Sequence, residues 1–151
     1  MSWSGFRFRH ERGTSAPELR DGGKGAILIV EDHLETQAVV AEYLSQEGFA
    51  VMLAADGESA FAQIRENRPI LVYLDMNLPH ISGYEVCERI RAEPSLSDVA
   101  ILMTSAQTSR QVEAFCLEAG ADAFLPKPFD LDNLATTIRR LISWRLSQVP
   151  A

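Results

Sequence analysis

Short apolar runs that each end at a charged residue are the feature of this chain that most limits its fold. Three of these runs are residues 26–30 before Glu31 and Asp32, residues 70–74 before Asp75, and residues 123–126 before Lys127. Apolar runs this short, without polar alternation, predict strands buried on both faces, as in a parallel sheet. Because open α/β sheets bind ligands at the carboxyl ends of their strands, the charged residues are predicted to lie at the binding edge.

Amphipathic segments separate the apolar runs and predict helices between the strands. Strands are expected at residues 26–30, 49–54, 70–74, 99–104 and 123–126. Helices are expected at residues 33–46, 58–67, 83–92, 110–119 and 131–145. This alternation predicts an α/β fold in which helices cover both faces of a five-stranded parallel sheet. Right-handed crossovers make such a fold doubly wound, and the expected strand order is the flavodoxin-like order 2-1-3-4-5.

Helical spacing also predicts which side chains of these helices face the core. In the first helix they are Leu34, Ala38, Ala41 and Leu44, and in the fourth they are Val112, Phe115 and Ala119. On the last helix, Arg139, Arg140 and Trp144 are expected on the outer face. Cys87 and Cys116 lack the spacing of a zinc site and are expected to be buried thiols rather than a disulfide.

Length and charge narrow the class of protein. The 151 residues suffice for one domain, expected at residues 25–147, after a glycine-containing tail at residues 1–24 that is expected to be flexible. Residues 26–151 hold nine basic and eighteen acidic residues, a net charge of −9, which argues against nucleic acid as the main ligand. No apolar run approaches the ~20 residues of a membrane span. The N-terminus lacks the apolar stretch of a secretory signal, so a cytoplasmic protein is expected.

The acids at the strand ends predict a cation site. In the expected strand order, the first and third strands are neighbours, so Glu31, Asp32 and Asp75 would share one crevice. Carboxylates held close together raise one another's pKa and destabilise the fold unless a positive charge neutralises them. A hard divalent cation with oxygen ligands, such as Mg²⁺, meets that need. The alternative is that these acids cap helices or face solvent at strand ends.

Five motifs in order are specific in combination. They are Glu31-Asp32 after the first strand, Asp75 after the third, Leu78-Pro79-x-x-x-Gly83 in the following loop, Ser105-Ala106 after the fourth, and Lys127-Pro128-Phe129 after the fifth. With them, residues 26 to about 146 resemble the receiver domain of two-component response regulators, in particular the stand-alone, chemotaxis-regulator-like kind. The common pattern has threonine where this chain has Ser105, and often tyrosine where it has Phe124.

The resemblance implies a role for each matching position. Asp75 is implied to be the phosphoryl acceptor, with Lys127 and Ser105 binding phosphoryl oxygens. Asp32, Asp75 and the backbone carbonyl of Asn77 are implied to bind Mg²⁺ directly, and Glu31 to bind it through water. Ser105 and Phe124 are implied to form the switch that responds to phosphorylation, and the Lys127–Pro128 peptide bond is implied to be cis.

The resemblance also implies the partners. A histidine kinase or histidine phosphotransfer protein would donate the phosphoryl group, and an unidentified downstream protein would read the change, without direct binding to nucleic acid or membrane. The domain would catalyse only its own phosphorylation and dephosphorylation. One alternative is an interaction module that works without phosphorylation. Another is a phosphatase of the haloacid dehalogenase type, which needs a second aspartate where this chain has Asn77.

Overall fold

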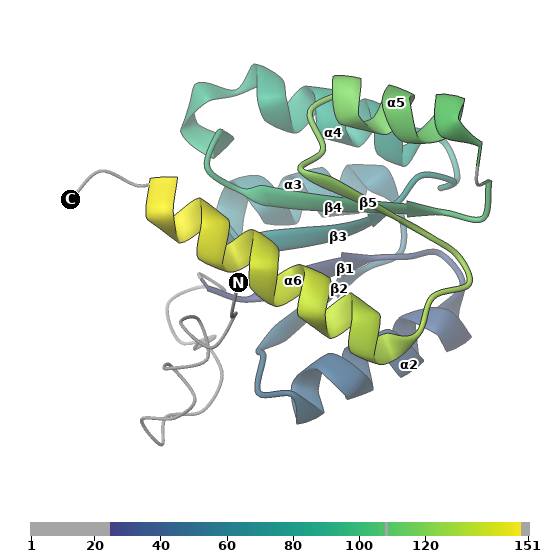
Figure 1. The fold of residues 1–151 in the computed structure, drawn as a ribbon. Coiled ribbons are helices and arrows are strands. Elements are labelled where there is room, and N and C mark those ends of the chain that lie inside the picture. The colour runs from purple at the N-terminus through teal and green to yellow at the C-terminus, as the bar shows by residue number, and fades with distance from the viewer. Residues whose placement is uncertain (1–24, 108, 149–151) are drawn as a thin grey trace.

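A computed structural model describes residues 25–107 and 109–148, and the tail predicted at residues 1–24 lies outside this range (Figure 1). Strands and helices alternate along the chain. The strands are Ile27–Val30 (β1), Val51–Ala54 (β2), Leu71–Asp75 (β3), Ala100–Ser105 (β4) and Ala123–Pro126 (β5). The helices are Leu34–Gln46 (α2), Gly57–Asn67 (α3), Gly83–Ala92 (α4), Arg110–Glu118 (α5) and Leu131–Gln148 (α6), with a short 3₁₀ turn at Pro94–Leu96 (η1).

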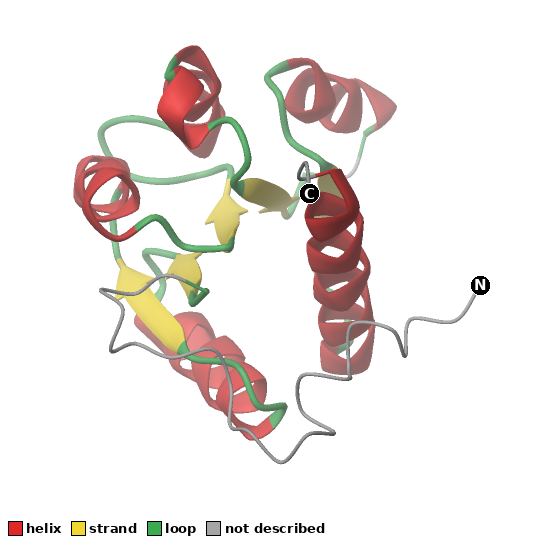
Figure 2. Cartoon of the chain, turned by 90° about the vertical axis from the view of Figure 1, so that its left-hand side faces the viewer, coloured by secondary structure: helices red, strands yellow, loops and turns green. Residues whose placement is uncertain are grey.

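The predicted fold class is confirmed. All four strand pairings are parallel, and the sheet has the order β2-β1-β3-β4-β5. One apolar cluster lies between the sheet and α3, α4 and α5, and a second lies between the sheet and α2 and α6. Figure 2 shows this sandwich, with helices on both sides of the twisted sheet. The residues of β1, β3 and β4 are buried on both faces, as their unbroken apolar runs predict.

The predicted start of β2 was wrong by two residues, for a reason visible at the end of α2. Gly48 takes a positive φ of 99° and reverses the chain, and the N–H of Phe49 then donates to the carbonyl of Leu44 at 3.0 Å. Phe49 therefore helps to end the helix and does not join the strand ladder, although its side chain is buried. The bounds of α4 and β5 are as predicted, the remaining strands and helices except β2 and α6 shift by one residue at one or both ends, and α6 continues three residues further, to Gln148.

Two of the four residues predicted on the inner face of α2 were placed wrongly, whereas Leu44 is buried as predicted and Ala41 packs against the core. Leu34 is 66% exposed and Ala38 is also exposed, whereas Gln37, Val40 and Leu44 are buried. Gln37 is polar, but its side-chain amide donates to two carbonyl oxygens at the top of the sheet, at 3.2 and 3.0 Å. A buried amide with both donors used is tolerated in a core. The hydrophobic pattern alone could not show these two bonds.

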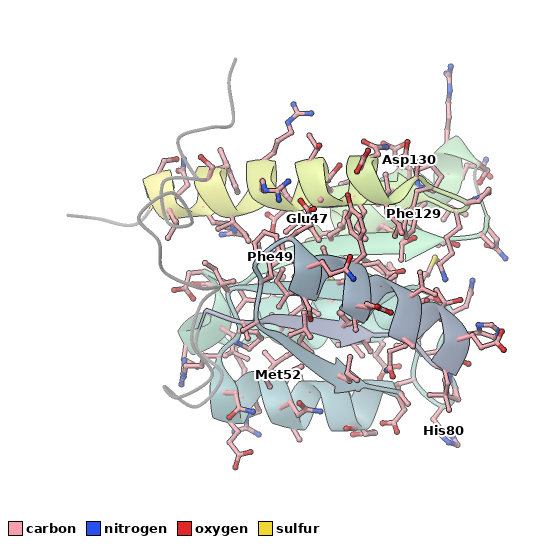
Figure 3. All side chains as sticks on the ribbon, turned by 90° about the horizontal axis from the view of Figure 1, so that it is seen from below. Glu47, Phe49, Met52, His80, Phe129 and Asp130 are labelled. Carbon is pink, nitrogen blue, oxygen red and sulfur yellow. The ribbon has the colours of Figure 1, made fainter. Side chains whose placement is uncertain are left out.

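Two further predicted orientations were also wrong. Phe115 of α5 is 55% exposed and packs against Tyr84 of α4 in a tilted arrangement, with ring centroids 5.3 Å apart, while Cys116 takes the inward position. Arg139 of α6 is only 8% exposed, because it forms an ion pair with Glu47 and lies over the Phe49 ring. Figure 3 shows Glu47 and Phe49 between α2 and α6, where this pair joins the two helices.

Both cysteines are buried free thiols, as predicted. Within the described part of the chain, no helix combines the length and apolar character that a membrane span requires.

Candidate functional site

Three strands deliver the charged residues to one place at the carboxyl edge of the sheet. Ile29 of β1 lies opposite Tyr73 of β3, so continuing this register by two residues brings Glu31 beside Asp75. Lys127 follows β5, and its Nζ atom lies 2.8 Å from Glu31 Oε1 and 2.8 Å from Asp75 Oδ2. One ammonium group thus bridges two carboxylates that come from different strands. This is the central contact of the site.

Burial makes this contact electrostatically strong. Glu31 is 1% exposed and Asp75 is 4% exposed. Burial raises the pKa of Glu31, the Lys127 ammonium opposes that rise, and the nearby Asp75 charge adds to it. Burial by itself lowers the pKa of Lys127, but the hydrogen bonds and charges of Asp75 and Glu31 outweigh it and raise that pKa. Lys127 is therefore charged at neutral pH, and its ammonium group opposes the rise in the pKa of Glu31.

A third acid completes an oxygen-rich cluster. Glu31, Asp32 and Asp75 each offer a carboxylate oxygen, and these oxygens all lie within 4.8 Å of one another. Asp32 is exposed, so the cluster opens to solvent on its side. Three carboxylates face one ammonium group, and a donor set made only of oxygens suits a hard cation such as Mg²⁺. The residues present therefore fit the predicted ion.

The loop after β3 closes around the Asp75 carboxylate. The N–H of Asn77 donates to Asp75 Oδ1 at 3.0 Å, and the N–H of Gly83 donates to the Met76 carbonyl at 2.9 Å. A Cβ atom on Gly83 would lie only 2.1 Å from the backbone oxygen of Asp75. Only glycine allows this approach. The Leu78-Pro79-x-x-x-Gly83 motif thus has a steric reason in the fold.

Ser105 of β4 lies opposite Pro126 of β5, two residues beyond Phe124. Thr104 is the register partner of Asp75, so Ser105 is the next residue of β4 beyond it. Ser105 is fully buried, and its hydroxyl accepts from the N–H of Gln107 at 3.0 Å. Phe124 is partly buried against the cluster under α3, α4 and α5. The Lys127–Pro128 peptide bond is cis, as the resemblance implied.

An open groove of about 830 Å³ borders the site on the side of α2 and α6. Lys127, Pro128 and Phe129 line one side of it, and His33 and Val39 line another. His33 caps α2 by accepting from the N–H of Thr36, so it has a structural use apart from the acidic cluster.

Sequence reasoning overlooked two residues beneath the carboxylates. Tyr73 and Thr104 are fully buried, and among the described residues their hydroxyl groups have no hydrogen-bond partner. Burial, and next the charges of Glu31 and Asp75, raise the pKa of Tyr73. The sequence offered one signal for Tyr73, which is the only phenol in the apolar run at residues 70–74. A fully buried tyrosine hydroxyl usually has a hydrogen-bond partner, so such a residue can be expected to serve a polar site.

Comparison with known proteins decides the family. The family model described as "Response regulator receiver domain" matches residues 27–139, which is most of the chain. The chain belongs to the response regulator receiver family. This receiver domain is 39% identical over 116 residues to the response regulator MprA of Mycobacterium sp. (strain KMS), and 37% identical to that of Mycobacterium avium (strain 104). In both comparisons the match covers 77% of this chain and 50% of the relative, so the chain spans about half the length of these relatives.

Solved receiver domains share the fold. A putative response regulator from Chloroflexus aurantiacus J-10-fl is 34% identical with a TM-score of 0.75, and the match covers 78% of this chain and 97% of that one. A CheY-like response regulator receiver domain protein from Methanospirillum hungatei JF-1 is 27% identical with a TM-score of 0.76, and the match covers 82% and 98%. The chain is thus a receiver domain of the two-component signalling type.

In this receiver domain, the residues predicted for the site converge at one edge of the sheet. Glu31, Asp75 and Lys127 are in direct contact, and Asp32 stands beside them. Ser105 lies on the adjacent strand. The roles implied for these residues, and the domain limits at residues 25–147, remain predictions.

Proposed function

We propose that this receiver domain takes a phosphoryl group onto Asp75 from a phosphohistidine, and that the phosphorylated form binds a downstream protein differently. The observation that carries this proposal is the Lys127 ammonium, held 2.8 Å from both buried carboxylates. The donor is a histidine kinase or a histidine phosphotransfer protein, since receivers of two-component systems work with such donors. One structural neighbour, from Syntrophus aciditrophicus, is described as a signal receiver domain of a signal transduction histidine kinase.

The chemistry needs an oriented carboxylate more than any other group. An oxygen of Asp75 forms the new bond to phosphorus while the phosphorus–nitrogen bond of the donor breaks, and the donor imidazole keeps the electron pair. The N–H of Asn77 holds Asp75 Oδ1 and Lys127 holds Oδ2, so the nucleophile has a defined orientation. Positioning and neutralisation of charge supply most of the catalysis in phosphoryl transfer.

Mg²⁺ belongs to the proposed site. Asp32, Asp75 and the backbone carbonyl of Asn77 would hold the ion directly, and Glu31 would hold it through water. When bound, the ion supplies positive charge against the phosphoryl oxygens. Lys127 would pair with a further phosphoryl oxygen, and its buried position makes that charge effective.

The switch couples the site to the face formed by α5, β5 and α6. Ser105 would turn its hydroxyl from the Gln107 N–H to a phosphoryl oxygen, and Phe124 would move inward behind it. Two hydrogen bonds to a charged group, from Lys127 and Ser105, supply about 3–6 kcal/mol. Moving a population from 1:99 to 99:1 takes about 5.5 kcal/mol. The site therefore has enough free energy for a substantial change in population.

Intact mass tests the proposal. The purified chain is incubated with a small-molecule phosphodonor and Mg²⁺, and one added phosphoryl mass is expected on the wild type and none on Asp75→Asn. Absence of the added mass on the wild type, or its persistence on Asp75→Asn, would refute the proposal. Full binding of a partner by Asp75→Ala would instead support an interaction module that works without phosphorylation.

A further inference from the structure

Tyr73 is a buried polar residue that the proposed chemistry does not yet use. It lies in the middle of β3, is 0% exposed, and faces the cluster of α2 and α6 together with Ile29 and Leu102. Its hydroxyl lacks a hydrogen-bond partner among the described residues, and so does the hydroxyl of Thr104. Buried polar groups without partners are rare, and each one costs free energy.

The register of the sheet places the phenol oxygen directly beneath the charged cluster. Tyr73 lies opposite Ile29 of β1 and Leu102 of β4, and Glu31 and Thr104 follow two residues later on those strands. Side chains two residues apart share a face, and long side chains lean along the strand. The tyrosine side chain thus extends along the strand toward the carboxyl edge of the sheet and brings its hydroxyl near the Glu31 carboxylate.

Phe129 fixes the other side of the ring. The two rings meet edge to face, with centroids 6.3 Å apart and planes at 75°. Phe129 directly follows Lys127-Pro128 and lies at the carboxyl end of the sheet, near the start of α6 (Figure 3). Tyr73 therefore touches the segment that carries Lys127 and also approaches the carboxylate that Lys127 binds.

The hydrogen bonds of Glu31 show where a further donor would act, beside the water through which Glu31 would hold Mg²⁺. Its carboxylate accepts from Lys127 at 2.8 Å and from the N–H of His33 at 3.3 Å. If Lys127 turns to a phosphoryl oxygen on Asp75, this carboxylate, 1% exposed, loses its stronger partner. A buried anion that loses a donor is strongly destabilised unless another donor replaces it. The phenol of Tyr73, neutral at physiological pH, is an unused donor on the same face of the sheet as Glu31.

We propose that Tyr73 is a positioning residue for phosphorylation, whose hydroxyl donates to Glu31 when Lys127 leaves Glu31 for a phosphoryl oxygen. This inference rests on the proposed function. Among the described residues, the hydroxyl has no partner in the unphosphorylated domain, and it would gain one in the phosphorylated domain. Its hydrogen bond therefore stabilises the phosphorylated form alone.

Beryllofluoride, a phosphoryl mimic that binds carboxylates, tests the inference. The half-saturating concentration is measured by fluorine NMR with Mg²⁺ present, for the wild type, Tyr73→Phe and Thr104→Val. Tyr73→Phe removes only the hydroxyl, and its half-saturating concentration is expected to rise about tenfold, which corresponds to about 1.4 kcal/mol. Thr104→Val, the matched control, removes the other unpartnered hydroxyl and is expected to stay within about twofold of the wild type.

Unfolding in urea, without Mg²⁺ or beryllofluoride, separates this role from a structural one. Tyr73→Phe is expected to be at least as stable as the wild type, because it removes a buried group without a partner. A loss of stability would show that the hydroxyl already has a partner, and would overturn the inference.

The binding measurements also distinguish a failure of the role proposed for Tyr73 from a failure of the proposed function. Equal binding by the wild type and Tyr73→Phe, or an equal loss in Thr104→Val, overturns the role of Tyr73 and leaves the function intact. Failure of the wild type to bind, with Asp75→Asn as reference, overturns both.

Discussion

Replacing Lys127 with methionine removes the charge of the central contact while keeping a side chain of similar length. Lys127 pairs with two carboxylates at 2.8 Å each, and the side chains of Glu31 and Asp75 are 1% and 6% exposed. The variant therefore leaves two buried anions without their cation. We expect Lys127→Met to destabilise the metal-free domain at neutral pH.

The burial of the two carboxylates sets the size of the stability loss expected for Lys127→Met. Breaking a fully buried ion pair costs about 3–5 kcal/mol. Lys127 is itself 22% exposed, so water screens part of its charge, and the lower end of that range, about 3 kcal/mol, applies. For a chain of this size, each kcal/mol shifts the Tm by about 2–4 °C. The expected decrease in Tm is therefore about 6–12 °C.

The pH dependence of this stability loss tests whether the charge of Lys127 is its cause. The raised pKa of Lys127 means that its contribution is fully present below its ordinary pKa of 10.5 and is lost only as the pH rises through the higher folded value. The pKa of Glu31 is also raised, so stability from its protonated form is present below 4.5 and is lost as the pH rises through the folded value. The variant lacks the ammonium that opposes this rise. Because a protonated Glu31 no longer needs the ammonium, the difference between the wild type and the variant should be smaller near pH 4.5 than at neutral pH.

Urea unfolding in EDTA at several pH values measures this difference. Arg65→Met is the control, because Arg65 pairs with Glu93 at 3.5 Å and is 61% exposed, and it should cost less than about 1 kcal/mol. Mg²⁺ should restore more stability to Lys127→Met than to the wild type, since the ion then supplies the missing charge. A cost below about 1 kcal/mol for Lys127→Met, or a cost independent of pH, would refute the electrostatic reasoning.

Two other substitutions test the surroundings of Asp75. Asp32→Asn removes one of three clustered acids, so the metal-free domain should gain about 0.5–1 kcal/mol of stability and a higher Tm. Its stabilisation by Mg²⁺ should decrease. A lower metal-free Tm in thermal unfolding would mean that the Asp32 carboxylate is structurally satisfied. Gly83→Ala places a Cβ atom 2.1 Å from the Asp75 carbonyl oxygen and should cost about 2–4 kcal/mol in urea unfolding. Stability equal to the wild type would show that the loop after β3 can relax away from the strand.

The sheet was predictable because its central strands are buried on both faces. Burial on both faces favours an unbroken apolar run along most of each strand, and such runs differ from the amphipathic helices around them. The edge strand β2 was predicted less well, since Leu53 on it is 46% exposed and Phe49 before it serves the end of α2. The inner faces of α2 and α5 depend on a glutamine amide and an aromatic pair, which hydrophobic spacing does not encode.

The candidate site also has features that the sequence predicted and features that it did not. The sequence motifs identify the acids, the amine and the small residues of the site, because chemistry at a strand end needs particular residue types at particular places in the chain. The burial of the Tyr73 hydroxyl without a partner among the described residues, and the inward position of Arg139, could not be predicted, since they depend on which side chains meet across the sheet or between two helices.

By itself, the sequence determined the order of strands and helices and the placement of Glu31, Asp32, Asp75 and Lys127 at strand ends. These properties follow from local burial patterns and from the crossover rule for parallel strands. Only the tertiary structure decided that one ammonium group bridges Glu31 and Asp75, from which it is separated by 96 and 52 residues. It also decided that the Tyr73 hydroxyl has no partner within residues 25–107 and 109–148. Such contacts depend on the register of three strands at once, and no local pattern of residues carries that information.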